Sequence, residues 1–89
     1  MKVRIELFGA SRDFSSHNSL DLNLNNNSTI KDIRNELINY LDEKFNGNEG
    51  YKKIVNSSAF CSADDNIVSD NYKITSNEKI AIIPPIGGG

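Results

Sequence analysis

The sequence predicts an α+β roll, a mixed sheet with one main helix packed across one face and a flexible C-terminal tail. Three observations predict it: two alternating strands come first, an amphipathic helix follows, and an apolar strand lies near the end. Elements with one apolar face bury those faces against each other. The 89 residues suffice for one small domain. We expect this domain to span residues 1–84, followed by an extended glycine-rich tail at 85–89.

Residues 2–7 and 19–24 each alternate between apolar and polar side chains. In KVRIEL, Val3, Ile5 and Leu7 alternate with charged residues, and in SLDLNL three leucines alternate with Asp and Asn. A period of two is typical of a half-buried strand. The two strands are expected to form an antiparallel hairpin, with the polar stretch GASRDFSSHNS between them as a loop.

Residues 30–45 are predicted to form the main helix. Apolar residues recur along it at three- and four-residue spacing: Ile30, Ile33, Leu37 and Leu41. This spacing places them on one helix face. Ser28 or Thr29 supplies the N-cap oxygen, and Gly47 follows as the terminator.

The segment between the helix and the last strand carries weaker signals. Within residues 46–58, Ile54 and Val55 fit a short helical turn, although the pattern leaves a plain loop open. The stretch AFCSADDNIV is predicted as a short hairpin around its Asp-Asp-Asn turn. Residues 69–78 are interpreted as loop and turn.

Residues 79–83, KIAII, are apolar on both faces, which is typical of a central strand. We expect this strand to lie parallel beside the first one. Pro84 and Pro85 then end the strand because neither has an N–H to donate.

Composition argues against several functional classes. The formal net charge of −2 offers no basic patch for nucleic acid or for an anionic membrane. A single cysteine cannot form an internal disulfide, which fits a reducing compartment. The N-terminal residues do not resemble a signal peptide and no stretch has the length of a membrane span. The expected location is the cytoplasm.

The chain shows no pattern of residues for catalysis, metal binding or cofactor binding. His17 stands alone in a polar loop and is interpreted as a surface residue, and Cys61 in AFCSA as a buried structural cysteine. One Cys and one His are too few for a zinc site. The aspartates near residues 64–70 lack the glycine and glutamate of a calcium loop, and no phosphate-binding glycine motif is present. We therefore expect no bound cofactor, no metal and no catalysis by the chain alone.

The tail AIIPPIGGG suggests a function. Pro84 and Pro85 favour an extended chain that points away from the sheet. The three glycines at 87–89 have no Cβ atoms, so they can enter a narrow tunnel and deliver the carboxylate of Gly89. Activated as an acyl-adenylate, that carboxylate becomes an electrophile that a sulfur nucleophile can attack. The alternative is a loose terminus without function.

These features together resemble the β-grasp (ubiquitin-like) sulfur carriers, and among them the small subunits of molybdopterin synthase. The resemblance covers nearly the whole chain. In LFGASRDF it rests on Phe8, Ala10, Arg12 and Asp13, and at the end on Ile83 to Gly89, which match apolar–Pro–Pro–apolar–x–Gly–Gly. Two departures stand out. SADDNIV replaces the Val-Asn-Gly turn that family members often have, and Gly87 replaces a small residue such as Ser, Ala or Thr.

The resemblance implies a mechanism and a set of partners. An ATP-dependent activating enzyme would adenylate Gly89, and a sulfur donor would convert it to a thiocarboxylate. The tail would then thread into the catalytic large subunit of molybdopterin synthase and give sulfur to a pterin precursor of the molybdenum cofactor. The chain would be a non-catalytic subunit of a heterotetramer. The threading residues would be Pro84, Pro85, Ile86, Gly87, Gly88 and Gly89.

Three alternatives remain open from the sequence. The chain could carry sulfur for another pathway, such as thiamine synthesis or tRNA thiolation. It could be a ubiquitin-related protein modifier whose Gly89 is joined to lysines. It could also be a non-covalent interaction module with an idle tail.

The strand pattern also predicts a docking surface. If Ile80 and Ile82 face the helix, Ala81 and Ile83 lie on the outer face of the sheet, beside Phe8 on the first strand. An apolar patch beside the tail favours partner binding, unless residues 46–58 cover this face. Arg12 is a further candidate for docking, as the partner of an acidic residue, or is simply solvated.

Overall fold

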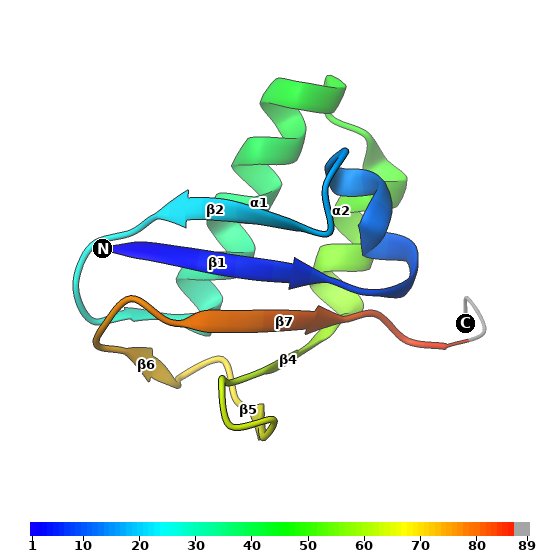
Figure 1. Ribbon diagram of the computed structural model, residues 1–89. Helices are drawn as coiled ribbons and strands as arrows, with labels where there is room; N and C mark the ends of the chain where they lie inside the picture. The colour runs from blue at the N-terminus through cyan, green and yellow to red at the C-terminus, as the bar shows by residue number, and fades with distance from the viewer. Residues whose placement is uncertain (87–89) are drawn as a thin grey trace.

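The computed structural model describes residues 1–86, and Figure 1 shows a twisted sheet with two helices packed across one face. The elements are β1 (Lys2–Leu7), the 3-10 helix η1 (Gly9–Phe14), β2 (Ser19–Asn23), β3 (Ser28–Thr29), α1 (Ile30–Phe45), α2 (Glu49–Ser57), β4 (Ala59–Cys61), β5 (Ile67–Val68), β6 (Lys73–Ile74) and β7 (Lys79–Ile83). Among these residues, no helix has the length and apolar character needed to cross a bilayer.

The main sheet has the strand order β2-β1-β7-β4-β5. β1 pairs antiparallel with β2 and parallel with β7, and β7 pairs antiparallel with β4. The predicted first hairpin, the central position of the last strand and its parallel pairing with the first strand are all confirmed. The predicted hairpin of β4 and β5 is also confirmed.

The core lies between this sheet and α1. The apolar faces of β1 and β7 and the predicted apolar face of α1 are fully or almost fully buried: Val3, Ile5, Leu7, Ile30, Ile33, Leu37, Leu41, Ile80 and Ile82. The two faces of β7 are buried to different extents, as predicted for Ile80 and Ile82 on the helix side and Ala81 and Ile83 on the outer side. Ile80 and Ile82 are 0% exposed, whereas Ile83 is 37% exposed. Only the helix side of β7 is covered.

Both ends of α1 have identifiable caps. Thr29 is the N-cap: its Oγ1 accepts from the Asp32 N–H at 3.3 Å, and Asp32 Oδ2 accepts from the Thr29 N–H at 2.8 Å. Ser28, the other predicted cap, instead donates its hydroxyl to the Asn25 carbonyl at 2.7 Å. At the other end Asn46 and Gly47 both have positive φ values, 55° and 74°, so the turn that ends the helix uses both residues.

The stretch predicted as a loop after β1 contains the 3-10 helix η1. The hydroxyl of Ser11 accepts from the Phe8 N–H at 2.9 Å and donates to the Phe8 carbonyl at 2.6 Å, which closes the first turn. Phe14 is 0% exposed. Its ring lies 5.3 Å from that of Tyr51 on α2, and its carbonyl accepts from the Tyr40 hydroxyl at 2.7 Å. Distant residues therefore stabilise this helix.

Two further elements are α2, where the sequence left a helical turn or a loop open, and β6, where it predicted a loop. Residues 49–57 form α2, with Asn48 as N-cap accepting from the Tyr51 N–H at 3.0 Å. The stretch 69–78, predicted as loop and turn, contains β6, which pairs with β3 in a separate two-stranded sheet. Burial of Ile74 at 0% exposure accounts for this pairing.

Candidate functional site

The candidate site is the edge of the sheet where β1 and β7 both end. Because the two strands run parallel, with Leu7 opposite Ile82, the chain leaves β7 beside the start of η1. β7 is also paired with β4, where Ala59 lies opposite Ile83. The base of the tail is thus held on both sides, as Figure 1 shows at the C-terminal end of β7.

The side chains at the start of the tail differ in burial. Pro84 is buried, whereas Pro85 and Ile86 are exposed, Ile86 at 99%. Gly9, which has a φ of +56°, lies close to Pro84: a Cβ on it would be 3.9 Å from the Pro84 ring. Pro84 therefore packs against the folded body, and its role in threading stays a prediction.

Pro85 and Ile86 are thus the first exposed residues after β7 and the last that the structure describes. Gly87, Gly88 and Gly89, the other predicted threading residues and the predicted reactive carboxylate, lie outside the described residues. Their assigned roles stay predictions.

The outer face of the sheet carries an apolar patch beside the tail, made by Phe8, Ala81 and Ile83. Phe8 continues β1 in extended backbone and is 40% exposed, Ile83 is 37% exposed and Ala81 is half-buried. α2 packs against α1 and η1 on the helix side of the sheet, so residues 46–58 do not cover this patch. The patch is available to a partner, and its docking role stays a prediction.

Sequence reasoning placed Cys61 wrongly and missed Ile67. Phe60 takes the buried position in β4 with 0% exposure, so Cys61 faces outward and is half-buried. Strand register places Cys61 beside Ala81 on one side and Ile67 on the other, and Ile67 is 75% exposed. The alternation within AFC, with Phe60 as the inward residue, was the signal that could have revealed both positions.

The other end of the same face is charged. Asp21 on β2 lies 3.2 Å from Arg4 and 3.8 Å from Lys2, and Lys79 lies 3.7 Å from Glu6. These exposed ion pairs link β2, β1 and β7, with Lys2 and Arg4 sharing the carboxylate of Asp21. The outer face is therefore divided into a charged end, where β1 and β7 begin, and an apolar end beside the tail.

Two further polar candidates are Arg12 and His17, and the docking role of Arg12 stays a prediction. Arg12 is exposed in η1 and takes part in no ion pair among residues 1–86, and His17 is exposed before β2. Within the described part of the chain, no three His, Cys, Asp or Glu side chains gather as metal ligands would.

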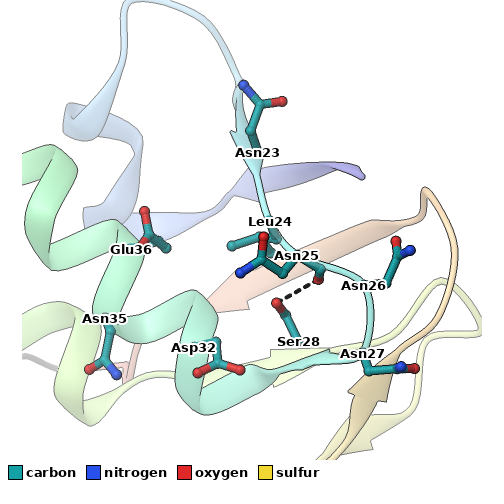
Figure 2. Close-up of a pocket in the computed structure, with 9 residues that line it drawn as sticks. All are labelled: Asn23, Leu24, Asn25, Asn26, Asn27, Ser28, Asp32, Asn35 and Glu36. Carbon is teal, nitrogen blue, oxygen red and sulfur yellow. Dashed lines mark hydrogen bonds between the residues drawn. The ribbon is translucent and has the colours of Figure 1, made fainter.

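Figure 2 shows a hollow lined mainly by polar side chains. Its volume is about 380 Å³, and it lies at the opposite end of the sheet from the end of β7. The connection between β2 and β3 forms one side, with Asn25 and Ser28, and α1 forms the other, with Asp32 and Glu36. Asp32 already serves as a capping residue. The neighbouring Leu24 N–H donates to the Met1 carbonyl, so this hollow lies at the edge where β1 begins.

Comparison with known proteins identifies a family. The ThiS family model matches residues 5–89. A comparison with curated protein sequences finds no significant match.

Several solved structures share the fold. SAMP1 from Haloferax volcanii superposes with a TM-score of 0.70 at 13% identity, covering 100% of both chains. A complex of subunits 1 and 2 of molybdopterin-converting factor from Helicobacter pylori contains a chain with a TM-score of 0.62 at 22% identity, also covering 100% of both. A ubiquitin from Caldiarchaeum subterraneum gives 0.62 at 16% identity, covering 100% of this chain and 98% of that one. These likenesses confirm the predicted ubiquitin-like β-grasp fold.

Proposed function

Because the chain belongs to the ThiS family of ubiquitin-like sulfur carriers, we propose that it carries sulfur for the synthesis of molybdopterin. The observation that carries the proposal is the ending Ile-Pro-Pro-Ile-Gly-Gly-Gly on the central strand of the sheet. Pro84 fixes the base of this segment in the body, and Pro85 and Ile86 are exposed beyond it. The fold holds the tail, and the last residue carries the chemistry.

The chemistry takes place at the carboxylate of Gly89. One of its oxygens attacks the α-phosphorus of ATP in the activating enzyme, which releases pyrophosphate and forms an acyl-adenylate. A persulfide donor then attacks the acyl carbon and expels AMP, because AMP is a far better leaving group than oxide. A thiol reduces the resulting acyl disulfide and leaves a thiocarboxylate.

Transfer takes place in a larger partner, the catalytic subunit of molybdopterin synthase. The segment from Pro85 to Gly89 enters the partner's active site, while the patch of Phe8, Ala81 and Ile83 docks on its surface. The Helicobacter pylori complex of subunits 1 and 2 supports a partner of this kind, because one of its chains has the fold of this protein. In the proposed complex with its own large subunit, this protein is the non-catalytic subunit and binds no cofactor of its own.

The test is the intact mass of the protein after co-expression with the activating enzyme and a sulfur source. We expect the mass gain of one oxygen-to-sulfur exchange, located at Gly89 by fragmentation. A variant lacking Gly89 serves as the control and is expected to stay folded and unmodified. An unchanged mass in the full-length chain would overturn the proposal.

A protein modifier is the alternative from another functional class. It draws support from the match to SAMP1, which is also described as small archaeal modifier protein 1. At 13% identity that match concerns the fold, which carriers and modifiers share. Lysine-linked adducts on a denaturing gel, lost on removal of Gly89, would favour the modifier. Sulfur transfer to a recipient of thiamine synthesis or tRNA thiolation, but not to a pterin precursor, would favour another carrier pathway.

A further inference from the structure

A second surface adjoins the tail, on the side of β7 opposite the outer patch. Successive residues Ile83 and Pro84 are exposed and buried, so they face opposite sides of the strand end. On the Pro84 side lies a groove of 470 Å³ between η1, α2 and the start of the tail. Its walls include Ala10, Ile54, Pro84 and Pro85, with Lys53 at its rim.

The groove is apolar but carries one uncompensated positive charge. The neighbouring Lys52 is neutralised, because its Nζ lies 2.8 Å from Asp42 and 3.6 Å from Glu49. Lys53 is exposed and takes part in none of the ion pairs among residues 1–86. An apolar surface with a single free cation is complementary to an apolar side chain next to a carboxylate.

The position of the groove along the chain indicates what can reach it. Pro85 is part of the groove wall, and Gly89 lies four residues beyond it. Four residues span at most about 14 Å when fully extended. A protein that binds Gly89 in its own active site must therefore come within this distance of the groove. Both the outer patch and the groove lie within reach of such a protein, because they adjoin the same strand end.

We propose that the groove receives an apolar side chain from the large subunit of the synthase, and that an adjacent carboxylate of that subunit pairs with Lys53. This inference rests on the proposed sulfur-carrier function. With the outer patch on one side and the groove on the other, the partner holds the base of the tail from two directions. Such a grip limits the directions open to Pro85 and Ile86, which lowers the entropy cost of placing Gly89 in the active site.

The test is the dissociation constant of the full-length chain and the isolated large subunit, measured by calorimetry at low and high salt. Lys53→Glu is expected to weaken binding about 10- to 100-fold, because it places like charges together at the interface. It is also expected to remove much of the salt dependence of the wild type. The matched control is Lys73→Glu, which makes the same change in net charge on β6, at the opposite end of β7 (Figure 1), and is expected to bind like the wild type.

A second pair of variants tests the shape of the groove without changing charge. Ala10→Phe partly fills the groove and is expected to weaken binding about tenfold by loss of complementarity. Ala63→Phe adds the same side chain to an exposed position in the turn between β4 and β5, away from the tail, and is expected to have no effect.

The outcomes separate this inference from the function on which it rests. If the wild type binds and both Lys53→Glu and Ala10→Phe match their controls, the groove proposal is overturned while the carrier function stands. If the wild type does not bind the large subunit at all, both are overturned. Weakening confined to Lys53→Glu and Ala10→Phe supports the groove as the second contact.

Discussion

The two ends of the outer sheet face differ in whether their exposed side chains have interaction partners within the chain. Where β1 and β7 begin, Lys2, Arg4 and Lys79 are matched by Asp21 and Glu6. Where the same strands end, the exposed side chains of Phe8 and Ile83 are apolar. A surface whose charges pair internally has little to gain from a partner, whereas exposed apolar area gains on burial. The division explains why the docking surface is assigned to the end beside the tail.

The largest expected effect is the difference in unfolding free energy between substitutions on the two faces of β7. Ile82→Ala removes a side chain that is 0% exposed, so the free energy of unfolding should fall by about 2–5 kcal/mol. Ile83→Ala, one residue on and 37% exposed, should cost about 1 kcal/mol or less. Urea denaturation of both variants measures the difference. Equal losses would show that the outer side of β7 is covered in solution.

The next effect concerns partner binding at the apolar end. Ile83→Asp places a charge in the outer patch and should weaken binding to the large subunit by about 1–2 kcal/mol, because apolar anchors beside a binding segment carry much of the affinity. The control is Arg4→Ala at the charged end, which should leave the affinity unchanged. Calorimetric titration measures both. A larger loss from Arg4→Ala would reverse the assignment of the two ends.

A smaller effect is expected when the charged end is disrupted. Asp21→Ala removes the carboxylate shared by Lys2 and Arg4. These pairs are exposed, so the loss in unfolding free energy should be about 1 kcal/mol or less. High salt should reduce this loss further, because screening weakens the ion pairs that the wild type has and the variant lacks. A loss that persists in high salt would point to packing of the Asp21 side chain instead.

The smallest effect concerns α2, which supports the groove behind the apolar end. The hydrogen bond from Lys52 to Asp42 raises the pKa of Lys52 above 10.5, aided by the charges of Asp42 and Glu49 and opposed by desolvation. A folded-state pKa above the unfolded value means that this contribution to stability is present below pH 10.5 and is lost as pH rises through the folded pKa. Chemical denaturation at pH 9 and pH 11 should show a slightly smaller decrease for Lys52→Met than for the wild type. An identical decrease would exclude the contribution of this pair.

β1, β2, β7 and α1 were predictable because each carries its own period. Val3, Ile5 and Leu7 report a buried strand face without any knowledge of the partner, and the apolar positions of α1 do the same for a helix. η1 was not predictable, because it depends on Phe14 meeting Tyr51, a residue 37 positions later. β6 has only two residues and no period to detect; burial of Ile74 under the fold decides it.

The same distinction holds for the candidate site. The end motif and the outward side of Ala81 and Ile83 follow from local sequence. Burial of Pro84 does not, because it depends on the close approach of Gly9. The groove could not be predicted from local sequence either, because η1, α2 and the start of the tail meet only in the folded chain.

The position of β7 between β1 and β4 also has a mechanical consequence. A partner that releases the tail pulls on Ile86 roughly along the strand axis. Such a pull loads the hydrogen bonds to both neighbours in shear, all at once, whereas a pull across an edge strand would break them one by one. The N-terminus of β1 lies at the opposite edge, where the Met1 amine donates to the Leu24 carbonyl at 2.7 Å. Under the proposed function, tension on the tail would therefore be shared by the ladders that join β7 to β1 and to β4.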